Sequence, residues 1–297
     1  MPEPLEAPPL IFAKLGGSLI TDKRHRSTPQ LAILRRLAKE LRAALETGKR
    51  PDQRNAWPDR DDPHRPPFQL VLGHGSGSFG HWEASKFGTR NGVQTDEEWH
   101  GFARVSAAAL QLNRLVTESF IEEDVPVLSL QPAASVLAKD GAITRLEIDP
   151  LYRALGHGLV PLVFGDVAFD DEIGGTILST EDIFVYLARI LKPSWILLFG
   201  NAPGVLDETR QTIPLITPAS YPAVQKQLGG SGYTDVTGGM ADKVQRMVAL
   251  VHEQPDLRVR ILSGSRPGNF RDALRDPEFH TSGTLICSQP VAPHRQR

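Results

Sequence analysis

The stretch "FQLVLGHGSGSFGH" (68–81) joins a short apolar run to a glycine-rich loop. Its first five residues have the length and apolar character of a buried strand. Gly75, Gly77 and Gly80 then follow the spacing G-x-G-x-x-G. A glycine loop at the end of a strand exposes backbone N–H groups that can bind a phosphate. The stretch therefore predicts a strand followed by a phosphate-binding loop, as in α/β folds.

The rest of the chain alternates short apolar runs with helical periodicity. Apolar runs typical of strands lie at 10–18, 125–130, 158–166, 195–199, 259–264 and 283–287, and apolar residues at helical spacing lie at 99–120, 179–191 and 240–251. Two further stretches, 141–148 and 167–178, have the pattern of hairpins. We predict an open three-layer αβα sandwich with a largely parallel central sheet.

Glycines follow several of the predicted strands. They are Gly16 and Gly17, Gly73, Gly75 and Gly77, Gly165, and Gly200 and Gly204. Because the carboxyl ends of parallel strands meet at one edge of a sheet, we expect these turns to line a single crevice.

The segment between the first two predicted strands has two parts. We expect a helix with Thr28 as N-cap and Pro29 at the first helical position. Residues 48–67 are rich in Pro, Arg and Asp and contain almost no aliphatic side chain, which predicts a solvated insertion without a catalytic role.

Composition narrows the class of protein. Among 297 residues, 33 Lys and Arg nearly balance 35 Asp and Glu, so charge does not indicate a nucleic acid as partner. The one cysteine, Cys287, excludes an internal disulfide framework and an iron–sulfur cluster. The N-terminal sequence lacks the pattern of a signal peptide, and no run of about 18 apolar residues predicts a membrane span. We expect a cytoplasmic protein that binds neither nucleic acid nor membrane.

Several familiar site motifs are absent or incomplete. A dinucleotide site needs an acidic residue at the end of the next strand, but 96–98 begin a long helix. The Walker sequence is missing because Arg50 follows Gly48 and Lys49, and neither G-x-S-x-G nor H-E-x-x-H occurs. The glycine loop carries its histidines seven residues apart with no cysteine beside them, which disfavours zinc. A dehydrogenase, a P-loop kinase, an esterase and a zinc enzyme are therefore disfavoured.

Four cationic side chains lie in or beside the glycine turns: Lys14, Lys23, His81 and Lys243. A single lysine on a loop is more often a solvated charge, and a single histidine beside glycines is more often structural. Their joint placement at predicted strand ends favours a functional role. Phosphoryl transfer requires charge neutralisation and alignment more than covalent chemistry, and cations on rigid turns provide both.

Five motifs occur in the order seen in the amino acid kinase superfamily. They are "AKLGGSLITDK" (13–23), "HGSGSFGH" (74–81), "GDV" (165–167), "STEDI" (179–183) and "DVTGGMADK" (235–243). Through them the chain resembles that superfamily over residues 10–288, and its histidine-bearing glycine loop is similar to that of the isopentenyl phosphate kinase family. The resemblance implies a homodimer of single amino acid kinase-like domains, with a phosphate-acceptor lobe at about 10–178 and a nucleotide lobe at about 179–288.

The resemblance also implies roles for individual residues. Catalytic roles fall to Lys14, Lys23, His81 and Glu181, nucleotide binding to Lys14, Gly16, Gly17, Ser18, Asn201, Gly204, Gly239 and Lys243, and acceptor binding to Gly75, Ser76, Gly77, His81 and Gly165. The family generally has Asp at position 181, where it orients the two catalytic lysines, so either Glu181 or Asp182 fills that role here. Residues 200–204 read G-N-A-P-G where the superfamily more often has T-D-V-D-G.

The resemblance implies an ATP- and Mg²⁺-dependent kinase that converts isopentenyl phosphate to isopentenyl diphosphate by in-line transfer. We name no protein ligand for the metal. A phosphate monoester, with a second pKa of about 6, is already largely dianionic at neutral pH and needs no catalytic base. The difficulty is repulsion between two anions, which the lysines, Mg²⁺ and His81 offset.

Two alternatives stay open. The same machinery suits another small phosphate or a phosphonate such as fosfomycin. A non-catalytic ligand sensor on this fold is the other alternative, suggested by Glu181 and the altered 200–204 loop. The apolar tail of an isopentenyl acceptor is expected near Ala84, Phe87 and the 99–120 helix.

Overall fold

The computed structural model describes residues 8–46, 66–229, 239–278 and 280–289. Nearly all of the predicted 48–67 insertion and the first residues of the 235–243 motif lie outside these ranges. The described residues form a central sheet in the order β10-β12-β11-β9-β1-β2-β6-β3. Its strands are β1 (Leu10–Leu15), β2 (Gln69–His74), β3 (Val127–Ser129), β6 (Val160–Phe164), β9 (Trp195–Gly200), β10 (Leu215–Ile216), β11 (Arg258–Ser263) and β12 (Thr284–Ile286). All neighbours are parallel except β11 and β12, so the predicted largely parallel sheet is confirmed.

Strands of the central sheet are buried on both faces. Along β1, Ile11, Ala13 and Leu15 enter one hydrophobic core, and Phe12 enters the other. Successive side chains of a strand point to opposite faces, so a strand covered by helices on both sides is apolar throughout. This explains why the sequence shows continuous apolar runs rather than alternation.

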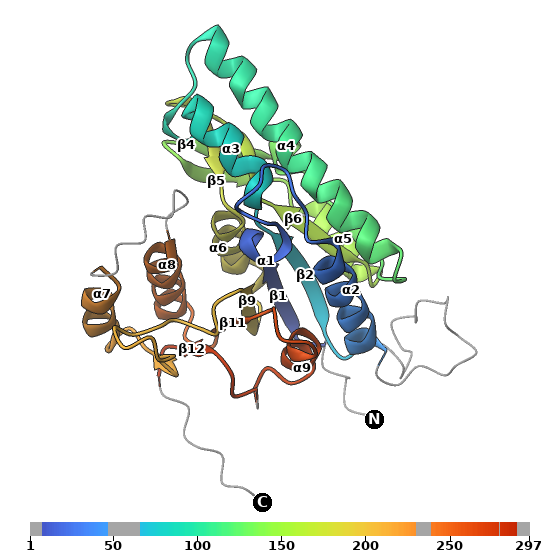
Figure 1. Cartoon of the computed structure of the whole chain (residues 1–297), viewed down its shortest axis with the longest axis vertical. Coiled ribbons are helices and arrows are strands. Elements are labelled where there is room, and N and C mark those ends of the chain that lie inside the picture. Colours follow the sequence, from blue (N-terminus) through green and yellow to red (C-terminus); the bar gives the residue numbers. More distant parts are fainter. Residues whose placement is uncertain (1–7, 47–65, 230–238, 279, 290–297) are drawn as a thin grey trace, which may run out of the picture.

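Helices cover both faces and make the three layers visible in Figure 1. The first core contains side chains from α1 (Gly17–Ile20), α2 (Leu31–Leu45), α3 (Gly77–Phe87), α4 (Asp96–Ile121) and α9 (Asn269–Arg275). The second contains side chains from α5 (Asp149–Gly156), α6 (Thr180–Leu191), α7 (Tyr221–Gly229) and α8 (Gly239–Glu253). The predicted αβα sandwich is confirmed. None of the helices in the described ranges is both long and apolar enough to cross a membrane.

The predicted hairpin at 167–178 is present, whereas 141–148 supplies only the second strand of a hairpin that begins at Val136; together the two hairpins form a second sheet. Its strands are β4 (Val136–Lys139), β5 (Ala142–Leu146), β7 (Asp166–Asp170) and β8 (Gly174–Leu178), in the order β5-β4-β7-β8. The pairs β4–β5 and β7–β8 are antiparallel, and β4 and β7 are parallel. Val167 of β7 packs with Phe102 and Val105 of α4, which attaches this sheet to the long helix.

The prediction for the start of α2 is wrong. The helix begins at Leu31 with Gln30 as its N-cap, not with Thr28 and Pro29. Pro29 instead pairs with Thr21 in an isolated bridge, and the Gln30 N–H donates to the Ile20 carbonyl at 2.8 Å. Extended pairing with the chain before the loop therefore overrides the local helix signal.

Candidate active site

Lys14 is the fifth residue of β1, and the alternation of the strand places its side chain on the same face as Phe12. That face is covered by α6 and α8. Glu181, the second residue of α6, forms an ion pair with Lys14. Its other carboxylate oxygen, Oε1, lies 4.0 Å from the Nζ of Lys243 on α8. Three charged side chains from three elements thus meet at the carboxyl edge of the sheet.

The charge of this cluster follows from the state of Glu181. Burial by itself would raise the pKa of the carboxyl group, but the positive charges of Lys14 and Lys243 and a hydrogen bond from Lys14 lower the pKa to about 2. Glu181 is therefore a carboxylate at neutral pH. With two ammonium groups the cluster has a net charge of +1, which favours an anionic ligand.

Asp182, the other candidate for orienting the lysines, contacts Ser179 and Arg246 instead. Its Oδ2 accepts hydrogen bonds from the N–H of Ser179 at 2.8 Å and from the hydroxyl of Ser179 at 2.6 Å, and its Oδ1 accepts from Arg246. Asp182 thus closes the capping box of α6. The sequence carries this signal as S-x-x-D at 179–182, which could have separated the two acidic residues.

Two glycine turns lie against each other beside Lys14. A Cβ on Gly17 would overlap the backbone nitrogen of Gly77, and one on Gly75 would lie 2.9 Å from the nitrogen of Gly17. Gly77 also has φ +50, a conformation that favours glycine. A Cβ on Gly75 would lie 3.8 Å from Lys14 Cε, so the predicted catalytic lysine lies beside the predicted acceptor loop.

The remaining predicted acceptor residues lie around the end of β2. Ser76 is the N-cap residue of α3, and His81, whose side chain is half-buried, is the fifth residue of that helix. Gly165 follows β6, and its N–H lies 3.4 Å from the carbonyl oxygen of His74. Gly75 follows His74 in the chain, and Gly165 lies against the His74 carbonyl, so the two glycines lie close together at the ends of the adjacent strands β2 and β6.

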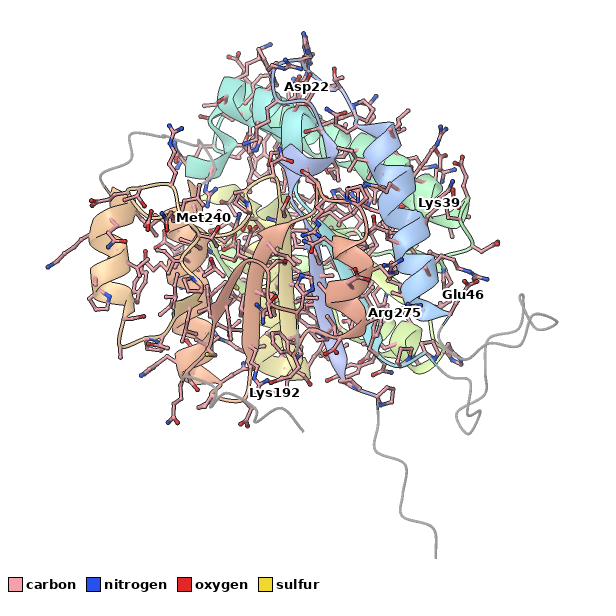
Figure 2. The ribbon with its side chains drawn as sticks, turned by 60° about the horizontal axis from the view of Figure 1, so that its bottom comes forward. Asp22, Lys39, Glu46, Lys192, Met240 and Arg275 are labelled. Atoms are coloured by element: carbon pink, nitrogen blue, oxygen red, sulfur yellow. The ribbon has the colours of Figure 1, made fainter. Side chains whose placement is uncertain are left out.

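Lys23 is exposed on the loop between α1 and α2. This loop is fastened to α3, because the N–H groups of Ser27 and Thr28 donate to the carbonyl and the hydroxyl of Ser78 at 3.2 and 3.3 Å. Arg26 of the loop also forms an ion pair with Glu83 of α3. In Figure 2 the loop, marked by Asp22, lies at the top of the molecule, and Lys192, which follows α6, lies at the opposite end.

Asn201 connects the loop after β9 to the first glycine turn. Its Nδ2 donates to the Ser18 carbonyl at 2.8 Å, and its Oδ1 accepts from the Ser265 hydroxyl at 3.2 Å. A second hydrogen bond connects the first glycine turn to β9: the Gly16 N–H donates to the Phe199 carbonyl at 2.7 Å. The loop therefore contacts the residues predicted to bind nucleotide.

The other two glycines predicted to bind nucleotide have different surroundings. Gly204 is buried, and a Cβ there would lie 2.6 Å from a methyl of Thr212 and 2.8 Å from the hydroxyl of Thr284. This packing is itself a reason for glycine at 204. Gly239, the first residue of α8, has φ +26 and no neighbour where a Cβ would lie.

Two buried titratable groups next to the acceptor loop were not assigned a role from the sequence. His74, the last residue of β2, is fully buried, and burial lowers its pKa to about 4, with a smaller contribution from the charge of Lys14. Asp166, which follows Gly165, is 1% exposed, and burial raises its pKa to about 6. Each is a polar residue beside a glycine at a strand end, which is the signal that could have identified it.

Comparison with known proteins identifies the family of this chain. Residues 9–263 match the model of the amino acid kinase family, and the chain belongs to that family. It is similar to the isopentenyl phosphate kinase of Haloferax volcanii, with 33% identity over 245 residues, 81% of this chain and 88% of the relative. The isopentenyl phosphate kinase of Methanocaldococcus jannaschii is 29% identical over 270 residues, 89% of this chain and 95% of the relative.

A solved isopentenyl phosphate kinase structure has the same fold. Its TM-score is 0.73 at 24% identity, and the match covers 93% of this chain and 99% of that one. The resemblance predicted from the five motifs is confirmed.

Proposed function

We propose that this chain transfers the γ-phosphoryl group of ATP to isopentenyl phosphate, giving isopentenyl diphosphate and ADP. The observation that carries the proposal is the cluster of Lys14, Glu181 and Lys243 beside two glycine turns packed backbone to backbone. The relatives named isopentenyl phosphate kinase support this particular acceptor.

The reaction brings two anions together, and the cluster reduces their repulsion. A phosphate monoester with a second pKa of about 6 supplies an anionic oxygen at neutral pH, so the transfer needs no general base. Two unit charges 4 Å apart repel by about 1 kcal/mol in water and by several times that in a less polar site. A net charge of +1 at the carboxyl edge of the sheet lowers this cost where the phosphoryl group passes.

We assign the roles as follows. Lys14 stabilises the transferring phosphoryl group, Lys23 the terminal phosphates of ATP, and Lys243 the nucleotide. Glu181 holds the two cluster lysines in place through its two oxygens, so it is a positioning residue. The division at about residue 178 into an acceptor lobe and a nucleotide lobe is part of this proposal. In the cluster, Lys14 comes from the first lobe, and Glu181 and Lys243 come from the second.

The acceptor phosphate is assigned to the second glycine turn. His81 donates a hydrogen bond to it, and Gly75, Ser76, Gly77 and Gly165 line its site. The closeness of Gly75 to Lys14 Cε supports this assignment, because it places the acceptor loop beside the lysine assigned to the transferring group.

The metal is assigned to the nucleotide rather than to the protein. Mg²⁺ bound by the phosphates of ATP would neutralise part of their charge. The described residues contain no group of three His, Cys, Asp or Glu side chains that could hold a metal ion, and both oxygens of Glu181 face lysines. These surroundings fit a metal that enters with ATP, and we assign it no protein ligand.

An acceptor panel tests the function. The chain is incubated with ATP and Mg²⁺ and with isopentenyl phosphate, dimethylallyl phosphate, fosfomycin or a nucleoside monophosphate, and ADP release is compared with a reaction lacking acceptor. ³¹P NMR identifies the product. We expect the highest kcat/KM with isopentenyl phosphate. If fosfomycin or the nucleoside monophosphate is turned over faster, that compound would replace isopentenyl phosphate as the proposed acceptor. If ATP binds but no phosphoryl group is transferred to any of the four compounds, the alternative of a non-catalytic ligand sensor would be favoured.

We also propose a homodimer located in the cytoplasm, on the basis of the family resemblance. Sedimentation velocity measures the first part. A species of twice the chain mass is expected, and a monomer at micromolar concentration would contradict it.

A further inference from the structure

The last residue of β2, His74, faces α4 and not the crevice. Along β2, Leu70 and Leu72 lie in the core that contains α4, and His74 follows at the same two-residue spacing. Gly73, on the other face, lies against α6, because a Cβ there would meet Thr180 and Phe184. The imidazole of His74 therefore lies between the start of the acceptor loop and α4.

Both ring nitrogens of His74 have polar partners. Nδ1 lies 3.1 Å from the carbonyl oxygen of Gly75, and Nε2 lies 3.1 Å from Nδ2 of Asn113 on α4. The Oδ1 of Asn113 lies 2.6 Å from the hydroxyl of Ser129 on β3. The ring also stacks on Phe164, with centroids 5.3 Å apart and planes inclined by 2°. Three polar residues from three elements thus form a continuous chain that ends at Gly75.

The direction of each hydrogen bond in this chain follows from chemistry. A carbonyl oxygen only accepts, so the hydrogen facing Gly75 must be on Nδ1 of His74. The buried ring is neutral at pH 7, which leaves Nε2 as an acceptor and turns the NH₂ group of Asn113 toward it. The Oδ1 of Asn113 then accepts from the hydroxyl of Ser129. Donation runs in one direction, from Ser129 to Gly75.

This chain fixes the orientation of one peptide group. In a trans peptide the C=O and the following N–H point in opposite directions, and the described residues contain no cis peptide. Since the Gly75 carbonyl points toward His74, the N–H of Ser76 points away from the buried ring. In the described parts of the chain no hydrogen bond occupies this N–H, so it can donate to a ligand.

We propose that Ser129, Asn113 and His74 form a hydrogen-bond relay that orients the Gly75–Ser76 peptide to bind the acceptor's phosphate. The inference rests on the proposed function, because it assigns the bound group. The three are positioning residues, since they act through the peptide. A further contact supports the role: the hydroxyl of Thr180, next to Glu181, donates to the His74 carbonyl at 2.6 Å. His74 is thus held from both faces of the sheet.

The first test breaks the relay in its middle. Asn113→Leu keeps a similar volume but removes the donor to Nε2. The Nε2 of His74 then has no partner, so the ring is fixed only through Nδ1 and the Gly75–Ser76 peptide is oriented less firmly. We expect KM for isopentenyl phosphate to rise about tenfold, the effect of one buried hydrogen bond, while KM for ATP stays within twofold.

Ser119→Ala is the matched control. Ser119 is also a buried polar residue of α4, but its hydroxyl donates only within the helix, to the Leu115 carbonyl at 2.8 Å. The control should change neither KM. If Asn113→Leu does not fold, Ser129→Ala removes the first donor of the relay more mildly, and we expect an acceptor KM about threefold higher. Equal rises of both KM values would mean a structural role only and would overturn the proposal.

A second pair of variants tests rescue at His74. The amide of His74→Asn places an N–H near the position of Nδ1, whereas His74→Leu has no donor. We expect the asparagine variant to keep its acceptor KM within about threefold of wild type and the leucine variant to lose about tenfold. Equal loss in the two variants would overturn the relay.

Tautomer and amide measurements need no substrate and separate the two proposals. ¹⁵N NMR of the wild-type ring should show hydrogen on Nδ1 and none on Nε2, and the Ser76 amide signal should shift in Asn113→Leu but not in Ser119→Ala. Hydrogen on Nε2 in the wild type would overturn the relay. If the NMR measurements give the expected results but isopentenyl phosphate is not turned over, the proposed function is wrong. The relay would then still be supported as the group that orients the Gly75–Ser76 peptide.

Discussion

The glycine turns after β1 and β2 and the loop after β9 meet at the same edge of the sheet, but different contacts hold them. The two turns touch through backbone atoms, and the Gly75 carbonyl of the second turn faces the fully buried ring of His74. The loop is held by the exposed Asn201, through hydrogen bonds to Ser18 and Ser265. Buried, satisfied polar groups are costly to disturb, whereas an exposed hydrogen bond contributes about 1 kcal/mol or less. In the proposed assignment, the acceptor side, which is the second glycine turn, is therefore the more firmly held, and the nucleotide side, which includes the loop after β9, tolerates more variation.

The largest expected effect comes from Lys14, which lies between the two sides. Lys14→Ala removes the cation assigned to the phosphoryl group, and we expect kcat to fall by about 10²–10³-fold. Glu181 then keeps only Lys243, so thermal melting and circular dichroism accompany the kinetics. Lys39→Ala, which removes an exposed lysine 3.8 Å from Glu123, is the control. A folded Lys14 variant with less than a tenfold loss would remove Lys14 from the mechanism.

Asp166 tests whether the acceptor side is as buried in solution as it is in the structure. Its pKa is raised from 3.8 to about 6, so the folded state keeps a proton that the unfolded state releases. The resulting stability is complete below pH 3.8 and is lost as the pH rises through 6. Asn does not titrate, so the free energy of unfolding of Asp166→Asn relative to wild type should increase by about 2 kcal/mol between pH 4 and pH 7.

Urea unfolding at the two pH values measures this difference. Asp171→Asn, on the exposed turn between β7 and β8, controls for the loss of a carboxylate elsewhere. A pH-independent difference for Asp166→Asn would show that water reaches the carboxyl group and that the acceptor side is less buried than we conclude.

His81 sharpens the comparison on the acceptor side. His81→Ala removes one hydrogen bond to a charged phosphate, and we expect KM for isopentenyl phosphate to rise about 10–100-fold while KM for ATP stays constant. His157→Ala, which removes an exposed histidine at the end of α5, serves as the control. Unchanged acceptor kinetics in the His81 variant would defeat the acceptor assignment.

The smallest effect is expected on the nucleotide side. Asn201→Asp replaces the N–H donor that faces the Ser18 carbonyl at 2.8 Å by a carboxylate oxygen. We expect KM for ATP to rise about 5–10-fold, with little change in KM for the acceptor. Ser265→Ala, which removes only the second partner of Asn201, should change KM for ATP by twofold or less. A larger effect on the acceptor than on ATP would contradict the division between the two sides.

Much of the fold could be predicted from local patterns. Continuous apolar runs identified the strands of the central sheet except the two-residue β10, and a stripe of side chains identified α4. The helices α1, α3, α5, α7 and α9 were not predicted, because four to eleven residues give too few turns for a clear period, and the strand β4 was also missed. The start of α2 was wrong because a pairing between Thr21 and Pro29 competes with the local helix signal.

The candidate site was predictable where its residues belong to a motif. Lys14 lies within three residues of Gly16 and Gly17, and the second glycine turn forms a compact motif at 74–81, so each could be recognised as a motif. Asn113 lay in the predicted stripe of α4, but its partner His74 is 39 residues away. A polar residue in an otherwise apolar stripe was the available signal, and it could not name the partner.

By itself, the amino-acid sequence determined the αβα class, the glycine turns at the strand ends and the kinds of charge beside them, because backbone freedom, side-chain periodicity and ionisation are local properties. Only the tertiary structure decided that Glu181 contacts the lysines while Asp182 caps its helix, and that the His74 ring faces the Gly75 carbonyl of the second glycine turn. Those outcomes depend on which face of a strand and which side of a helix end meet across the sheet, and that is set by the packing of elements far apart in the chain.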